Sequence, residues 1–270
     1  MPKPSPFPYE SAVITGASSG LGKALSYLLA KKGVPLLITG RDESKLFEIQ
    51  KELSSFAKIE ILALDLTKSD KQDLFFSAME SFKPDLILHA AGFGYYGPLL
   101  AYSLSDWLQM TELHVNVSLK IAYLGASQMI KAKKRGTILL VSSAAALNNF
   151  PNFSVYSATK AFINRFAMSC DSEVKPYQVR ILTTCPGMIH TPFRLRASMG
   201  DADPSTPWDI EVDKAAEEII WQVVRKKRFH IFDIRYRLIN FLSHLLPKKM
   251  VEAFLSKTIQ KRFPKNLRQL

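Results

Sequence analysis

Short apolar runs alternate along the chain with longer stretches in which apolar positions recur every three or four residues. The short runs are rich in Val, Ile and Leu and show little polar alternation, which is typical of strands buried on both faces of a sheet. They predict strands at 12–15, 35–39, 60–64, 86–89, 137–142 and 180–185, with an edge strand at 228–232.

Helices are predicted in the longer stretches, at 22–32, 45–54, 68–81, 104–133, 155–175 and 212–226. Alternating strands and helices form β-α-β units, whose right-handed crossovers build a parallel sheet. We therefore expect an α/β fold, a doubly wound (Rossmann) parallel sheet of about seven strands with helices on both faces. No internal repeat or low-complexity linker appears, so one domain is expected.

A glycine-rich turn follows the first predicted strand, in the sequence Thr15-Gly16-Ala17-Ser18-Ser19-Gly20-Leu21-Gly22. Glycines allow a tight turn there, and the start of the next helix offers free N–H groups and the positive end of its dipole to an anion. A glycine-rich turn between a strand and a helix is typical of a dinucleotide diphosphate site. The alternative is an ordinary strand-to-helix turn.

A tyrosine and a lysine, Tyr156 and Lys160, are four residues apart in a predicted helix and would share one face. An ammonium beside a phenol favours the phenolate, so we expect the tyrosine pKa to fall below its usual value of about 10. Ser143, at the end of the fifth strand, could donate to a carbonyl oxygen as charge develops. Ser142 is the neighbouring alternative, and a surface Tyr–Lys pair is the alternative for the helix.

These segments resemble the short-chain dehydrogenase/reductase family, whose T-G-x-x-x-G-x-G motif is matched by Thr15, Gly16, Gly20 and Gly22. The resemblance implies hydride transfer between a nicotinamide cofactor and a carbonyl/alcohol carbon. It implies that Tyr156 is the general acid in reduction, that Ser143 orients the carbonyl, and that Lys160 binds the nicotinamide ribose. Asn116, in His114-Val115-Asn116-Val117, matches the family asparagine whose backbone carbonyl holds a water linking Lys160 to solvent.

A cofactor site is also implied by the resemblance, and no metal ion is part of it. Gly40 stands where NAD-preferring relatives have an acidic residue, and Arg41 can pair with a 2′-phosphate, so NADP(H) is expected rather than NAD(H). Arg41 could instead stack on adenine or face solvent. Asp65 matches a residue that contacts adenine, with a helix cap as its alternative. Besides Tyr156 and Lys160, the implied cofactor-binding residues are Gly16, Ser18, Gly20, Leu21, Gly22, Arg41, Asp65, Leu66, Ala91, Gly92, Pro186, Gly187, Ile189 and Thr191.

His89 and Ala90 depart from the family's usual Asn-Asn before Ala91-Gly92. His89 is expected to be a hydrogen-bonded structural histidine. The loops after the fourth, fifth and sixth strands predict a largely apolar pocket and a lipophilic ketone or alcohol as substrate. The residues expected there are Phe93, Tyr95, Tyr96, Leu147, Phe150, Phe153, Met188, Phe193 and Met199. Packing within the loops is the alternative for these side chains.

The positive charge is concentrated at the C-terminus. Residues 225–270 carry 13 basic and two acidic side chains, a net +11 of the chain's +12. We expect residues 1–232 to form the catalytic domain and residues 233–270 to form a basic, amphipathic helical extension packed on it. The extension could also lie on a membrane surface, cover the substrate pocket or mediate dimerisation. No aromatic-basic platform or helix-turn-helix spacing indicates a nucleic-acid partner.

Other expectations concern the state of the protein in the cell. Two cysteines inside predicted elements indicate thiols in a reducing, cytoplasmic setting, with peripheral membrane contact through the tail left open. Relatives in the family suggest a homodimer or homotetramer. The proline-rich segment Met1 to Tyr9 is expected to be an unstructured leader. An NAD-linked alcohol dehydrogenase and a catalytically silent dinucleotide-binding regulator are the rival functions, the second disfavoured by the intact catalytic residues.

Overall fold

Seven parallel strands form a single sheet in the computed structural model, which describes residues 7–201, 209–243 and 245–267. The order is β3-β2-β1-β4-β5-β6-β7, so the chain winds outward from β1 in both directions. The strands are β1 (Ala12–Thr15), β2 (Leu36–Gly40), β3 (Ile59–Ala63), β4 (Leu86–His89), β5 (Gly136–Val141), β6 (Val179–Cys185) and β7 (Phe229–Ile231). The predicted doubly wound sheet is confirmed, and β7 is at its edge.

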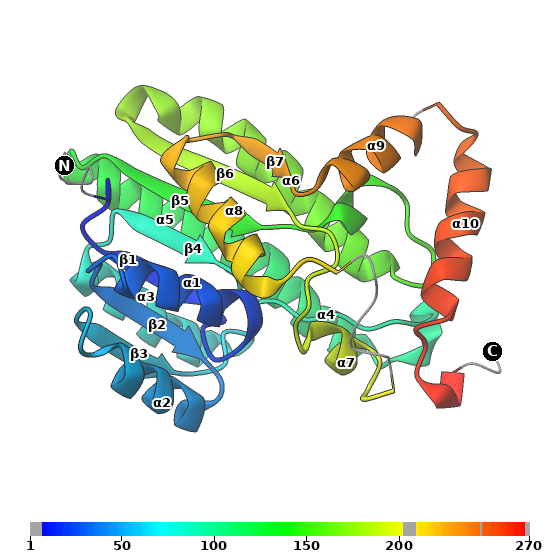
Figure 1. The fold of residues 1–270 in the computed structure, drawn as a ribbon, viewed down its shortest axis with the longest axis horizontal. Helices are drawn as coiled ribbons and strands as arrows, with labels where there is room; N and C mark the ends of the chain where they lie inside the picture. The colour runs from blue at the N-terminus through cyan, green and yellow to red at the C-terminus, as the bar shows by residue number, and fades with distance from the viewer. Residues whose placement is uncertain (1–6, 202–208, 244, 268–270) are drawn as a thin grey trace.

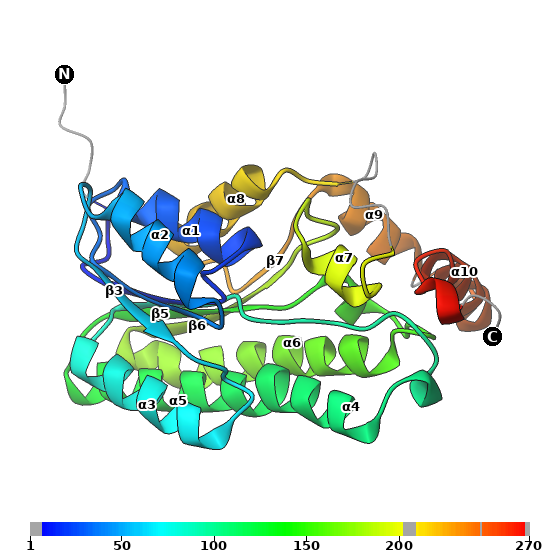
Figure 2. The same ribbon diagram turned by 90° about the horizontal axis from the view of Figure 1, so that it is seen from below.

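Helices cover both faces of the sheet (Figures 1 and 2). One layer holds α1 (Gly20–Ala30), α2 (Glu43–Leu53) and α8 (Val212–Val224), and the other holds α3 (Ser69–Phe82), α4 (Leu104–Thr111), α5 (Val117–Lys131) and α6 (Ser154–Val174). Each layer buries its apolar stripe on the sheet, as Leu25 and Ile219 do on one face and Phe75 and Ile121 on the other. Two buried cores, one on each face, therefore stabilise the sheet and fix the position of the loops at the carboxyl ends of its strands.

The predicted helix 104–133 is two helices rather than one. A capping box between Ser103 and Asp106 begins α4, and a π turn at Glu112–Asn116 separates it from α5. In this turn the N–H of Val117 bonds to the carbonyl of Glu112, five residues back. A π turn adds a residue to the helical turn, so it changes which side chains point toward the sheet.

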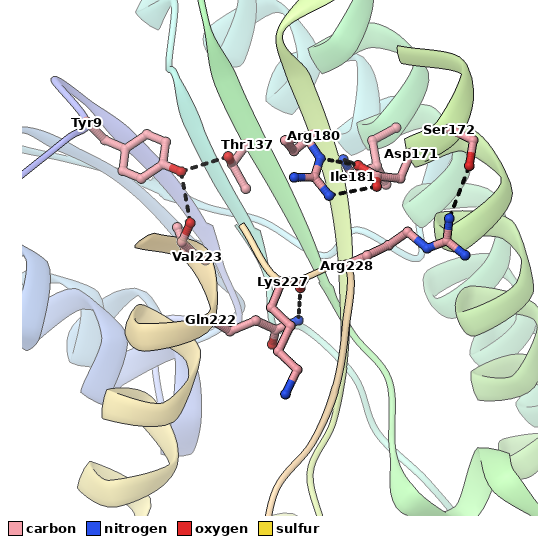
Figure 3. Close-up of polar contacts among 10 residues, drawn as sticks. All are labelled: Tyr9, Thr137, Asp171, Ser172, Arg180, Ile181, Gln222, Val223, Lys227 and Arg228. Carbon is pink, nitrogen blue, oxygen red and sulfur yellow. Dashed lines mark hydrogen bonds and ion pairs between the residues drawn. The ribbon is translucent and has the colours of Figure 1, made fainter. Parts of the chain in front are cut away.

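The segment before β1 is not an unstructured leader where the structure describes it. Tyr9 is buried, and its hydroxyl donates to the carbonyl of Val223 at 3.2 Å (Figure 3). The hydroxyl of Thr137 lies 2.7 Å from the hydroxyl oxygen of Tyr9. Because the proton of Tyr9 is used in the bond to Val223, Thr137 is the donor in this second hydrogen bond. Tyr9 thereby joins β5 to α8. Residues 1–6 lie outside the described part of the chain.

The extension after β7 forms two further helices, α9 (Ile234–Ser243) and α10 (Lys248–Gln260), beyond the carboxyl ends of the strands (Figure 1). Within the described residues, α9 has no buried side chain and α10 has one, Ile259. None of the helices described is both long and apolar enough to span a membrane.

Candidate active site

An open cleft of about 640 Å³ runs along the carboxyl ends of the strands. Every site residue predicted from the sequence lines this cleft except Asn116. Residues from the glycine-rich turn, from the ends of β2 to β6 and from the C-terminal extension meet there, although they are far apart in the chain. The position agrees with the rule that doubly wound sheets bind ligands beyond the carboxyl ends of their strands.

The glycine-rich turn leaves room for a diphosphate. Gly16 has φ +72°, and a Cβ there would lie 2.9 Å from the backbone of Ala91, so a side chain would force this turn away from the end of β4. Ser19 precedes α1, and no described side chain caps the N–H groups of its first turn. Free N–H donors at a helix start, reached over bare glycine backbone, are the surface that a diphosphate requires.

Two arginines lie in the part of the cleft that adjoins the glycine-rich turn. Arg41 follows β2 and is exposed. Arg196, in the short helix α7 (Phe193–Ala197), donates from Nη2 to the hydroxyl of Ser19 at 3.2 Å. Neither forms an ion pair with a described carboxylate. Position 40 has little space for an acidic side chain, since a Cβ at Gly40 would lie 2.8 Å from the Ser18 hydroxyl. These features could hold a 2′-phosphate.

Tyr156, Ser143 and Lys160 come together in the middle of the cleft. Tyr156 lies in the first turn of α6 and is 7% exposed, with the ring of Phe153 stacked on it at 4.2 Å. The side chain of Ser143 shares a hydrogen bond with Tyr156. The Lys160 ammonium lies 5.7 Å from the centre of the tyrosine ring and donates to the carbonyl of Val141 at 2.9 Å.

Ser142, the alternative to Ser143, serves a different purpose. It is buried, and its hydroxyl donates to the backbone carbonyl of Lys160 at 2.8 Å. That bond fixes α6 to the end of β5 and leaves Ser143 as the serine whose side chain reaches Tyr156.

The electrostatic environment of the tyrosine differs from the sequence prediction. Burial raises the pKa of Tyr156 above its usual value of 10, and the hydrogen bond with Ser143 lowers it by less. Burial also lowers the pKa of Lys160 from 10.5 to about 7. The prediction of a lowered tyrosine pKa was wrong, because desolvation penalises the phenolate and the ammonium alike.

The side chain of Asn116 does not reach this cluster, and the role implied for its backbone carbonyl stays a prediction. It is exposed, and its amide donates to the carboxylate of Glu112. His114 lies there instead, fully buried, with its ring 5.7 Å from that of Tyr156. A Cβ at Gly92 would contact both His114 Nε2, at 3.1 Å, and Lys160 Nζ, at 3.4 Å. Within this π turn the side chain of His114 is buried, and that of Asn116, two residues further on, is exposed.

Hydrogen bonds define the protonation of His114. The hydroxyl of Thr159 donates to the carbonyl of Tyr156 at 2.8 Å, so it must accept from His114 Nδ1, which is 2.9 Å away. Nε2 accepts from the backbone N–H of Phe93 at 3.2 Å. Burial lowers the pKa of His114 well below 6.5. His114 is therefore a neutral ring that ties the turn after β4 to the start of α6.

His89 has the structural character expected of it. The ring is buried, and Nδ1 lies 2.7 Å from the hydroxyl of Thr15, which also accepts from the N–H of Ala91 at 3.1 Å. Burial lowers the pKa of His89 to about 3, so it is neutral.

The other half of the cleft is apolar and is closed by the extension. Six of the nine predicted pocket residues line it: Phe93, Tyr96, Phe150, Phe153, Met188 and Phe193. Tyr95 stacks on Tyr102 instead, Met199 is exposed, and Leu147 is not part of the lining. The sequence left coverage of the pocket by the extension as an alternative without naming residues for it. The residues that the extension supplies are Tyr236, Ile239, Phe254, Leu255, Thr258, Ile259 and Arg262.

Specific contacts hold the extension over the cleft. Asn149 donates to the carboxylate of Glu252 at 2.8 Å, and Asn152 donates to the hydroxyl of Ser256 at 2.9 Å. The ring of Tyr236 covers Gly187 so closely that a Cβ there would lie 2.0 Å from it. The extension therefore forms one wall of the cleft. This arrangement agrees with one alternative left open by the sequence, in which the extension covers the substrate pocket.

Comparison with known proteins agrees with this geometry. The model of the short chain dehydrogenase family matches residues 10–200. An uncharacterised oxidoreductase of Staphylococcus epidermidis is 25% identical over 228 residues, which are 84% of this chain and 96% of that protein. A short-chain dehydrogenase from Sphingobium yanoikuyae, solved in complex with NADPH, superposes with a TM-score of 0.76 at 21% identity, covering 87% of this chain and 93% of that one.

A further solved structure, the bulky-bulky ketone specific alcohol dehydrogenase from Comamonas testosteroni, gives a TM-score of 0.75 at 18% identity, with 87% and 92% of the two chains covered. At these identities the two structures show the fold. The family match extends over more than half of the sequence and includes the glycine-rich turn and the Tyr156–Lys160 helix. The chain is therefore an oxidoreductase that belongs to the short-chain dehydrogenase family.

Proposed function

We propose that this enzyme uses NADP(H) to reduce a lipophilic ketone, with Tyr156 as the proton donor. The observation that supports the proposal is that one cleft contains both a glycine-rich part and an aromatic part, with polar side chains between them. Tyr156, Ser143 and Lys160 lie where its glycine-rich half meets its aromatic half. A carbonyl held against Tyr156 would have an apolar chamber on one side and the cofactor on the other.

The residues present fit the cofactor. When bound, NADPH supplies the hydride. The turn at Gly16–Gly22 would hold its diphosphate, Arg41 and Arg196 its 2′-phosphate, Asp65 the adenine, and Lys160 with Thr191 the nicotinamide riboside. The absence of a carboxylate at position 40 disfavours the NAD-linked alternative, and the Sphingobium relative was solved with NADPH.

The proton chemistry follows from burial. Because desolvation raises the pKa of Tyr156, its proton stays on the oxygen until negative charge develops on the substrate. Tyr156 then gives that proton to the substrate oxygen, while the hydroxyl of Ser143 donates a hydrogen bond to the same oxygen. A protonated Lys160 stabilises the phenolate that remains. His114 acts through position, since its hydrogen bonds fix the first turn of α6.

The lining indicates the class of substrate. Aromatic and aliphatic side chains cover most of the chamber, and Phe153 and Phe193 each pack on the ring of Tyr156. A small polar ketone would leave this apolar surface wet, whereas a bulky apolar ketone gains the free energy of its burial.

The outer surface of the extension supports peripheral membrane contact. Leu238, Phe241, Leu245 and Met250 are each more than half exposed. Basic residues accompany them, at Arg237, Lys248, Lys249 and Lys257. Exposed apolar side chains with neighbouring cations are the composition of a helix that lies in a membrane interface. We expect sedimentation with vesicles rich in anionic lipid and weaker sedimentation with neutral vesicles.

A second apolar surface supports self-association. Leu104, Leu108, Leu119 and Tyr123 of α4 and α5 are 43% to 71% exposed. A second copy of the chain would cover them, so light scattering after gel filtration should give the mass of a homodimer or homotetramer.

Cofactor titration tests the function. NADPH and NADH are titrated by fluorescence, and a panel of bulky ketones is then followed by cofactor absorbance. Tight NADPH binding with turnover of bulky ketones supports the proposal. Better turnover with NADH would favour the NAD-linked alternative. Binding without turnover of any ketone would favour the catalytically silent regulator.

A further inference from the structure

A charged side chain of the extension faces the apolar half of the cleft. Arg262 follows α10, is half-buried and lines the cleft together with Tyr96, Met188 and Tyr236. The segment around it is firmly packed, since Ile259 and Phe263 are buried against the aromatic cluster of Tyr96 and Trp107. Arg262 is thus held at the end of the chamber that is built by the extension.

Arg262 lacks an acidic partner among the described residues. Its Nη2 lies 2.7 Å from the thioether sulfur of Met188, which is a weak acceptor. The nearby carboxylate of Asp209 is paired with Arg194, and both of those side chains are buried. A half-buried guanidinium whose partners are the Tyr96 hydroxyl and a thioether has recovered only part of the hydrogen bonding that it gave up to water.

Two tyrosine hydroxyls accompany the guanidinium. The charge of Arg262 acts on both Tyr96 and Tyr236, and burial raises the pKa of each above 10. The Tyr236 hydroxyl accepts from the N–H of Met188 at 3.0 Å, so its own proton remains available. At neutral pH Tyr96 likewise keeps a proton to donate. This part of the cleft therefore has three donor groups, on Arg262, Tyr96 and Tyr236. Among the described residues no free carboxylate lies beside them, and such a set of donors is suited to binding an anion.

We propose that Arg262 binds an anionic group, a carboxylate or a phosphate, at the far end of the substrate, which is therefore an anionic amphiphile. The inference rests on the proposed function and names its substrate class. The rings of Tyr96, Phe153 and Tyr156 pack in sequence, at centroid distances of 4.8 and 4.2 Å, between Arg262 and the catalytic hydroxyl. An apolar chain laid along these rings would join a carbonyl at Tyr156 to an anion at Arg262.

Matched ketones test the anion site. Three compounds of equal chain length are compared: a methyl ketone, the same ketone with a terminal carboxylate, and the same ketone with a terminal phosphate. The readout is the ratio of kcat/KM for each anionic ketone to that for the neutral one. Arg262→Gln should lower this ratio about 10- to 100-fold, the range for losing hydrogen bonds to a charged group. The ratio for Arg262→Lys should fall between those of the parent and of Arg262→Gln, because lysine keeps the positive charge without the planar guanidinium.

Lys261→Gln is the control, since it removes an equal charge from the exposed neighbouring residue and should leave the ratio unchanged. The larger change with carboxylate or with phosphate identifies the natural group. An unchanged ratio in Arg262→Gln, or an equal fall in Lys261→Gln, overturns the anion site even if the enzyme reduces ketones.

A binding experiment separates the two hypotheses. If the parent enzyme reduces none of the ketones, the proposed function fails, and calorimetry on the NADPH-loaded protein then compares an alkyl phosphate and an alkyl carboxylate with the alkanol of the same length. Preference for the anions that Arg262→Gln abolishes supports the anion site by itself. Equal binding of anion and alkanol overturns it.

Discussion

The two ends of helix α6 each bury a charged side chain, but the two side chains differ in how many hydrogen-bond partners they have. Near its last turn, Asp171 is almost fully buried and accepts from Nε and Nη2 of Arg180, at 2.7 and 2.8 Å, and from the N–H of Ile181 at 3.0 Å (Figure 3). Near its first turn, Lys160 is equally buried, and its ammonium donates to one carbonyl, that of Val141.

The difference indicates that one end of the helix contributes mainly to stability and the other is available for chemistry. A buried charge with a full set of partners holds the helix to β6. A buried ammonium with one partner has a lowered pKa and can still bind another group. The carboxyl edge of the sheet thus keeps hydrogen-bonding capacity for a ligand, and the opposite end of α6 secures the helix that bears it.

The largest effect is expected at the catalytic end. Tyr156→Phe should lower kcat about 10²- to 10⁴-fold, the usual contribution of a general acid, because no proton donor would remain at that position. NADPH affinity and the thermal unfolding midpoint should change little, since the ring and its packing stay. Steady-state kinetics, fluorescence titration and a thermal melt measure the three quantities. Near-normal kcat would remove Tyr156 from its role.

At the other end, Asp171→Ala should lower the free energy of unfolding by about 3–5 kcal/mol, because the guanidinium of Arg180 would lose its buried partner. Urea unfolding measures this loss, and kcat per folded molecule should stay near the parent value. Glu173→Ala, exposed on the same helix end, is the control and should have almost no effect. A small change in Asp171→Ala would show that the pair does not anchor the helix.

The pH dependence of stability should distinguish the two ends. The pKa of Lys160 is about 7 in the folded chain and 10.5 when unperturbed. Between these values the unfolded chain binds more protons, so this group makes stability rise with pH across that window and opposes folding below it. Urea unfolding of the parent and of Lys160→Met between pH 7 and 10 should show a steeper rise in the parent. Parallel curves would contradict the lowered pKa.

The smallest of these effects concerns the exposed cations. Arg41→Ala should weaken NADPH binding about 10-fold and NADH binding much less, since the 2′-phosphate would lose a charged partner near solvent. Arg196→Gln should act in the same direction and more weakly. Lys45→Gln, also exposed and close in sequence to Arg41, is the matched control. Equal losses for the two nucleotides would sink the 2′-phosphate assignment.

Local patterns were enough to predict most of the fold and much of the candidate site. Each strand lies within a few residues of its apolar run, because a strand buried on both faces must be apolar throughout. The glycine-rich turn and the Tyr156–Lys160 pair are also local, since a tight turn and a shared helix face depend on neighbours in sequence.

Tertiary structure decided the rest. The turn at Glu112–Asn116 places the side chain of His114 at the site, and burial reverses the expected shift of the Tyr156 pKa. Arg196 and Arg262 line the cleft although they come from segments that are distant in sequence. The apolar pattern of these segments predicts that they contain helices, but it does not predict which part of the protein each helix contacts. Periodicity records which side of an element is apolar, whereas the partner across the cleft, and with it the desolvation of each group, exists only once the chain has folded.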